Sequence, residues 1–184
     1  RPAIDVTTYG HAPLARLRSG EHVPKSVRPA WESVVADLLI KVEQLFTEHP
    51  YTSIRVHGDC HPGNLLCRDD SFFIVDLDDC RMGPAIQDLW MMLAGDYQER
   101  LSQLSELVDS YQEFYDFSPR ELPLIEGLRA LRLLHYSAWL AQRWDDPAFP
   151  QSFPWFGTER YWGEQILILR EQRAALDEPY LKLF

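Results

Sequence analysis

The hydrophobic pattern of the chain is mainly helical. Apolar residues spaced three and four apart predict an amphipathic helix between Pro29 and Pro50. Further helices are expected over residues 85–93, where the sequence is apolar nearly all round and therefore buried, and over 99–117 and 159–176. Another is expected to run to about Trp144, starting at a capping-box sequence, Ser118–Glu121, or a turn later at Pro123.

Short strands occupy the middle of the chain. Ile54 and Val56 predict a strand, and the apolar runs 65–67 and 72–75 on either side of the polar turn 68–71 predict a β-hairpin. If Arg68 pairs with Ser71, counting back along both strands places Asn64 opposite Val75 and beside Asp76. The hairpin then brings together two oxygen-bearing side chains that are distant in the sequence.

Two segments lack a clear period. Residues 1–26 contain prolines and glycines and predict a partly ordered connection. Residues 145–156 contain Pro147, Pro150 and Pro154 among aromatic residues, and predict a loop held by aromatic burial.

Composition limits the class of protein. A chain of 184 residues with 46% hydrophobic content can bury the core of one domain. A net charge of -10 argues against nucleic acid and anionic membrane as partners. No apolar run approaches the ~20 residues of a membrane span. The odd set of cysteines, Cys60, Cys67 and Cys80, lacks metal-site spacing and indicates reduced thiols, as in a cytoplasmic protein.

Residues 57–64, His-Gly-Asp-Cys-His-Pro-Gly-Asn, carry the clearest chemical signal. We call them the HGD loop. Their spacing, H-x-D-x-x-x-x-N, is that of a kinase catalytic loop, in which the Asp accepts the proton of the attacking hydroxyl and the Asn oxygen holds Mg²⁺. The spacing predicts Asp59 as the base and Asn64 as a metal ligand, with His57 supporting the loop.

The segment 73–79, which runs from the second strand of the hairpin into the residues after it, supplies the rest of the predicted Mg²⁺ site. Mg²⁺ needs only one or two carboxylates besides water and phosphate oxygens. Asp76 fits that requirement beside Asn64. If the strand continues, Asp78 lies on the same face as a weaker candidate, and Asp79 points away.

The stretches HGDCHPGNLL, VDLDDCRMGPAIQDLWMML and LRALRLLHYSAWLAQRWDDPAFPQSFPW resemble the aminoglycoside phosphotransferase and choline kinase superfamily, and within it the bacterial stress response kinase A family. This resemblance implies the C-terminal lobe of a protein-kinase-like fold, mainly α with short β-hairpins. It implies transfer of the γ-phosphoryl group of ATP to Ser or Thr of a protein, with Mg²⁺ as cofactor. It also implies that Asp88 braces the HGD loop from below.

The chain carries no glycine-rich G-x-G-x-x-G loop and no VAIK-like strand before the HGD loop, and it begins with Arg1. We therefore expect residues 1–26 to connect to a missing ATP-binding lobe and residues 27–184 to form the C-terminal lobe, as a monomer.

Three alternatives remain open at this point. A cation site built from Trp144, Trp155 and Trp162 with Asp145 and Asp146 would favour a small amino alcohol or aminoglycoside as acceptor. The spacing of His57, Asp59 and His61 could instead ligate a transition metal in a phosphoesterase. The lobe could also be a non-catalytic binding module. The sequence leaves open whether Cys60 is redox-sensitive or only fills the loop.

Overall fold

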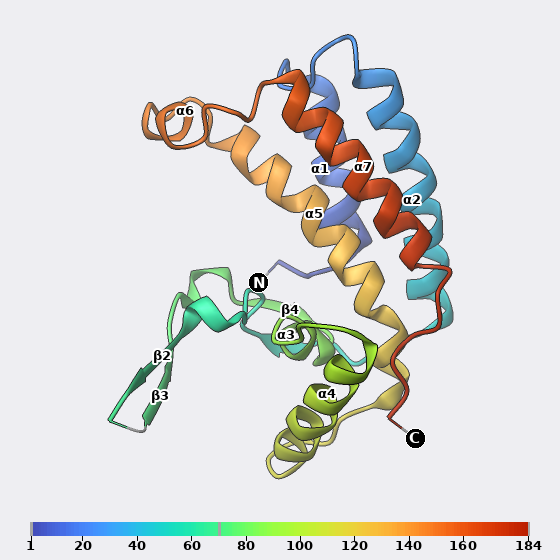
Figure 1. The fold of residues 1–184 in the computed structure, drawn as a ribbon, viewed down its shortest axis with the longest axis vertical. Coiled ribbons are helices and arrows are strands. Elements are labelled where there is room, and N and C mark those ends of the chain that lie inside the picture. Colours follow the sequence, from blue (N-terminus) through green and yellow to red (C-terminus); the bar gives the residue numbers. More distant parts are fainter. Residues whose placement is uncertain (1, 70, 184) are drawn as a thin grey trace. The chain divides into compact units, whose positions relative to one another are not determined.

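The computed structural model describes residues 2–69 and 71–183, and the chain divides into two compact units. The helical unit consists of Asp5–Glu48 and Glu126–Glu178. The loop unit consists of His49–Ile125 with residues 2–4 and 179–183 at the chain ends. Figure 1 shows the elements of both units along the chain.

The helical unit is built around two long helices that lie side by side, α2 (Arg28–Glu48) and α7 (Glu159–Ala175). Between them, the rings of Trp31 and Trp162 meet edge to face at 5.6 Å, and both side chains are almost fully buried. Gly127, near the start of α5 (Ile125–Gln142), allows close packing, because a Cβ atom there would lie 2.9 Å from a methyl group of Leu45. The expected helices are therefore confirmed in this unit.

The N-terminal segment differs from the prediction. Residues expected to form an irregular connection contain a π-helical turn, Thr7–His11, followed by α1 (Ala12–Ser19). Leu14 and Leu17 of this helix are buried. The hydrophobic repeat is only about one turn long, too short to register as a period, and tertiary packing stabilises the helix instead.

The aromatic segment 145–156 also contains more structure than a loop, because α6 (Ala148–Ser152) lies within it. Phe156 is fully buried and packs on Trp144 at 5.0 Å and Trp162 at 5.6 Å between ring centroids. Aromatic burial therefore holds the segment, as expected.

The loop unit contains two antiparallel two-stranded sheets. β1 (Ile54–Val56) pairs with β4 (Arg81–Gly83), and β2 (Leu65–Arg68) pairs with β3 (Ser71–Ile74). The hairpin register is the predicted one, with Arg68 opposite Ser71. Strand β4 was not predicted, because its partner lies 27 residues earlier and its three residues are too few to show an alternating pattern.

Helices complete the loop unit. The buried helix is shorter than predicted, α3 (Ile86–Trp90), and α4 (Tyr97–Gln112) begins two residues earlier and ends five earlier than expected. A capping box between Asp96 and Glu99 fixes the start of α4. The capping box expected at Ser118–Glu121 is wrong. The Glu121 carboxylate accepts the backbone N–H of Ile86 at 3.0 Å instead, and Pro119–Leu124 forms a 3₁₀ helix.

The predicted fold class is confirmed, because helices dominate and the strands are short and antiparallel. Within residues 2–69 and 71–183, none of the helices combines the length and hydrophobicity that a membrane span requires.

Candidate active site

The HGD loop begins where β1 ends, and a glycine sets its direction. Gly58 has φ +89°, a conformation that residues with a side chain rarely adopt. A Cβ atom at this position would lie 2.6 Å from the backbone carbonyl oxygen of Asp79. The turn therefore requires glycine both for its dihedral angle and for the close approach of the chain after β3.

Asp88 of α3 holds the start of the loop. Its Oδ2 accepts the backbone N–H of His57 at 2.6 Å, and its Oδ1 accepts that of Gly58 at 2.9 Å. Burial raises the pKa of Asp88, and these two N–H groups partly offset that effect by stabilising the carboxylate. The neighbouring Gln87 donates its side-chain amide to the carbonyl of Gly58 at 3.0 Å. Helix α3 thus braces the loop, which is the position that the resemblance implied for Asp88.

His57 is a structural member of the loop. Its Nε2 lies 2.8 Å from the carbonyl oxygen of Val75, which can only accept, and its Nδ1 accepts the backbone N–H of Asp59 at 3.3 Å. These partners fix the tautomer with the hydrogen on Nε2. Both ring nitrogens of His57 are therefore occupied by the fold.

This engagement removes the geometric basis of the phosphoesterase alternative. A transition-metal site on His57, Asp59 and His61 would need a free ring nitrogen on His57. In the part of the chain that the structure describes, no three His, Cys, Asp or Glu side chains come together as a metal site.

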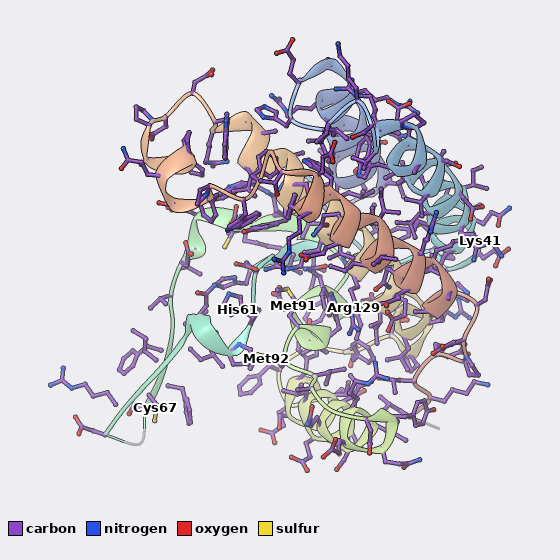
Figure 2. All side chains as sticks on the ribbon, turned by 45° about the horizontal axis from the view of Figure 1, so that its top comes forward. Lys41, His61, Cys67, Met91, Met92 and Arg129 are labelled. Carbon is purple, nitrogen blue, oxygen red and sulfur yellow. The ribbon has the colours of Figure 1, made fainter. Side chains whose placement is uncertain are left out.

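A tight turn brings Asp59 and Asn64 together. The carbonyl oxygen of Asp59 accepts the side-chain amide of Asn64 and the backbone N–H of His61, both at 2.9 Å. Because Asn64 donates through Nδ2, its Oδ1 is the side-chain atom that can ligate a cation. His61, which is labelled in Figure 2, precedes the 3₁₀ turn Pro62–Asn64, and its Nε2 lies 3.6 Å from Asp59 Oδ2.

The hairpin places Asp76 next to Asn64 in the way that the sequence predicted. Leu65 pairs with Ile74, and the N–H of Val75 donates to the carbonyl of Asn64 at 3.0 Å. One residue later, Asp76 adopts the left-handed conformation, φ 63° and ψ 54°, and its side chain is exposed. A carboxylate and an amide oxygen on adjacent backbone segments are a donor set suited to Mg²⁺.

The predicted alternation of Asp76, Asp78 and Asp79 is wrong. Strand β3 ends at Ile74, and Leu77–Asp79 forms a 3₁₀ helix. Asp78 therefore has no strand that would place it on the face of Asp76. The Asp79 carboxylate lies 3.3 Å from the guanidinium of Arg81.

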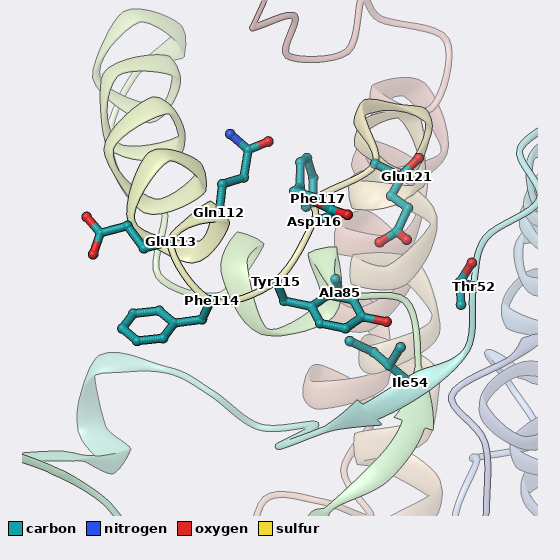
Figure 3. Close-up of a pocket in the computed structure, with 11 residues that line it drawn as sticks. Thr52, Ile54, Ala85, Gln112, Glu113, Phe114, Tyr115, Asp116, Phe117 and Glu121 are labelled. Carbon is teal, nitrogen blue, oxygen red and sulfur yellow. The ribbon is translucent and has the colours of Figure 1, made fainter.

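Two side chains at this site were missed by the sequence reasoning. Gln87 carries no motif of its own, although it directly precedes Asp88. Glu121 lines a hollow of about 550 Å³ at the start of α3, together with aromatic residues of the segment 114–117 (Figure 3). Its hydrogen bond to Ile86 anchors the helix that carries Asp88. Only long-range packing could show this link.

The aromatic cation site weighed from the sequence is not formed as predicted. The Trp162 side chain is fully buried among Trp31 and Phe156, so it can form no wall of an acceptor groove. Trp155 remains 38% exposed, and its ring packs on Tyr161.

Comparison with known proteins agrees with the kinase-like spacing of the HGD loop. The model of the phosphotransferase enzyme family matches residues 7–125. Stress response kinase A of Escherichia coli O157:H7 is 45% identical over 183 residues, which are 100% of this chain and 55% of that protein. Serine/threonine protein kinase RdoA of Salmonella typhimurium is 44% identical over the same shares. The chain thus spans about half the length of the curated relatives it matches.

Among solved structures, spectinomycin phosphotransferase in complex with ADP and spectinomycin has a TM-score of 0.49 and 15% identity, over 93% of this chain and 53% of that chain. The expected similarity to the stress response kinase A family is confirmed by sequence. The match over residues 7–125, which contains the whole HGD loop and the hairpin, shows that the chain belongs to the phosphotransferase enzyme family.

Proposed function

We propose that the protein containing this chain transfers the γ-phosphoryl group of ATP to a hydroxyl group, that of Ser or Thr in a protein substrate. Family membership and the names of the kinase relatives support this proposal. The observation that carries it is the hydrogen-bonded link from Asp59 through Asn64 to Val75. The Asn64 side-chain amide donates to the Asp59 carbonyl at 2.9 Å, and the N–H of Val75, the residue before Asp76, donates to the Asn64 carbonyl at 3.0 Å.

Asp59 is the proposed general base. As the acceptor oxygen forms its bond to the γ-phosphorus, the bond between that phosphorus and the leaving oxygen of ADP breaks. The hydroxyl proton passes to the Asp59 carboxylate. The side chain of Asp59 is 21% exposed, so a substrate hydroxyl can approach it from solvent. Hydrogen bonds to the N–H and carbonyl of Asp59 fix the backbone from which this carboxylate projects before the substrate binds.

Asn64 Oδ1 and the Asp76 carboxylate are the proposed Mg²⁺ ligands. The metal ion would neutralise charge on the transferring phosphate. The chain's own contribution is to hold the two oxygens at one end of the hairpin, through the bond from the Val75 N–H to the Asn64 carbonyl. Asp78 stays a weaker proposal, resting on its nearness to Asp76 in the sequence.

The remaining expectations are also proposals. We infer that the ATP phosphates are bound by the part of the relatives that this chain does not match, since the chain contains no glycine-rich loop. The three cysteines are free, which supports a reducing, cytoplasmic environment. A monomeric state is likewise a proposal.

The test uses the full-length protein with Mg²⁺, γ-labelled ATP and a generic Ser/Thr protein substrate, comparing wild type with Asp59→Asn. We expect label on Ser or Thr in the wild type and a loss of about 10²- to 10⁴-fold in the variant, the range for removal of a general base. The melting temperature should stay nearly unchanged. Consumption of ATP only with small amino alcohols or aminoglycosides would move the acceptor to a metabolite. No transfer at all would favour a non-catalytic module.

A further inference from the structure

His61 faces the proposed base from within the same loop. Its Nε2 lies 3.6 Å from Asp59 Oδ2, and the His61 side chain is the more exposed of the two, 38% against 21%. The imidazole therefore lies at the solvent edge of the carboxylate. The sequence pattern suggested His61 only as a metal ligand, and phosphoryl transfer as proposed above gives this residue no role.

The other ring nitrogen of His61 fixes which atom faces Asp59. Nδ1 accepts the backbone N–H of Gly63 at 3.0 Å, so its lone pair points at a donor. The neutral ring then carries its hydrogen on Nε2. The atom directed at the carboxylate is consequently an N–H donor. Such contacts are often long without substrate and shorten in the reacting complex.

The loop is shaped to hold the ring in this position. A Cβ atom on Gly63 would lie 2.7 Å from Cε1 and 2.9 Å from Nδ1 of His61, so the ring packs directly against the glycine backbone. The backbone of His61 is fixed as well, because its N–H donates to the Asp59 carbonyl and its carbonyl accepts from Asn64, both at 2.9 Å. The ring of His61 and the backbone of Asp59 thus belong to one hydrogen-bonded turn.

We propose that His61 is a positioning residue for phosphoryl transfer, whose Nε2–H fixes the orientation of the Asp59 carboxylate. This inference rests on the proposed function of Asp59. A carboxylate can rotate about its last side-chain bond, and proton transfer requires one orientation. The Nε2–H holds Oδ2 and thereby selects the orientation in which the carboxylate meets the substrate hydroxyl. The effect is therefore on turnover and not on ATP binding.

Two substitutions distinguish the role of Nε2 of His61 from that of Nδ1. In His61→Gln the side-chain amide nitrogen reaches the place of Nε2 and keeps a donor towards Asp59. In His61→Asn the shorter amide places its oxygen near Nδ1 and keeps only the acceptor for the Gly63 N–H. If the proposal holds, kcat of His61→Asn falls about 10- to 100-fold, as in His61→Ala, with KM for ATP unchanged. His61→Gln retains most of the activity.

A matched control is His11→Asn, because His11 Nε2 also contacts a carboxylate, that of Glu43, but in the helical unit. Its kcat should equal that of the wild type. The reverse pattern, with His61→Asn active and His61→Gln inactive, would overturn the proposal and assign His61 to holding Gly63. Full activity of all three His61 variants would overturn it too.

A second measurement does not depend on activity. In the full-length protein labelled with ¹⁵N-histidine, the ring of His61 should show the Nε2–H tautomer, and its Nε2 resonance should shift in Asp59→Asn. An Nδ1–H tautomer, or no shift, would overturn the proposal even if phosphoryl transfer were confirmed. Conversely, the expected spectra with an inactive wild type would refute the proposed function while leaving the contact in place.

Discussion

The carboxylate of Asp88 accepts the backbone N–H of Gly58 at 2.9 Å, and its other oxygen accepts that of His57 at 2.6 Å. One side chain from α3 thus satisfies two consecutive donors of the HGD loop, directly before Asp59. The loop that carries the proposed base is held by a helix that lies 30 residues later in the sequence.

Asp88→Asn should weaken this brace. The amide offers one acceptor oxygen, and its NH₂ group faces the second backbone N–H, which is left unsatisfied at a cost of about 1–3 kcal/mol. We expect the melting temperature to fall by roughly 2–4 °C per kcal/mol lost, with reduced transfer. Thermal unfolding of Asp88→Asn measures this loss. The control is Asp109→Asn, a change at an exposed position of α4. Equal melting temperatures for the two variants would contradict the bracing role.

Asp76→Asn should remove a metal ligand without straining the chain. Asn, like Asp, tolerates the left-handed conformation found at this position, so only the charge is lost. We expect a higher Mg²⁺ concentration for half-maximal transfer and lower kcat. The control is Asp79→Asn, whose carboxylate pairs with Arg81 at 3.3 Å. A metal requirement raised equally in both variants would show a general charge effect in place of ligation.

Gly58→Ala should destabilise the loop unit. The new Cβ would lie 2.6 Å from the Asp79 carbonyl, at a φ of +89° that costs an ordinary residue on the order of 1–2 kcal/mol by itself. The counterpart is Gly163→Ala in α7, where nothing lies within 4 Å of the added atom. That change should stabilise the protein by roughly 0.5–1 kcal/mol, since Ala favours helix. Calorimetry should show a lower melting temperature for Gly58→Ala and a higher one for Gly163→Ala than for the wild type.

Glu121→Gln should alter the pH dependence of stability. Burial raises the pKa of Glu121 above its ordinary value of 4.5, against the opposing effect of the backbone N–H groups of Ile86 and Ala85. The folded protein therefore binds this proton more tightly than the unfolded chain. The resulting stabilisation is fully present below pH 4.5 and is lost as the pH rises through the folded-state pKa.

The Gln side chain does not titrate, so the free energy of unfolding of the wild type should fall relative to Glu121→Gln over that pH range. Urea unfolding of both proteins at a series of pH values gives the difference. A difference that stays constant or grows in favour of the wild type with rising pH would contradict the assignment.

Cys60 should be unreactive despite its place beside Asp59. Burial raises the pKa of its thiol to about 11, and the charges of Asp88 and Asp59 act in the same direction. The thiolate is the reacting species, so alkylation should be slow. Mass spectrometry after timed iodoacetamide treatment should show Cys67, exposed on the hairpin and labelled in Figure 2, modified first. Faster modification of Cys60 would revive the redox hypothesis.

Local features of the chain were determined by the sequence alone. The spacing of Asp59 and Asn64 lies within one turn, and the hairpin register follows from two apolar runs around a short polar turn, so neighbouring residues suffice to specify both. The long helix Arg28–Glu48 likewise follows from its own periodicity. The hairpin register and the helix were confirmed because the forces that set them act between residues close in sequence.

Tertiary structure decided what depends on competition between distant partners. Glu121 was predicted to cap its own helix, but the buried N–H of Ile86 takes its carboxylate, since an unsatisfied buried donor costs more than an exposed one. The close approach of Gly58 to Asp79 coincides with the end of the strand at Ile74 and the left-handed turn at Asp76, where alternation had predicted a continuing strand. Periodicity carries no information about such long-range contacts, whereas packing determines them.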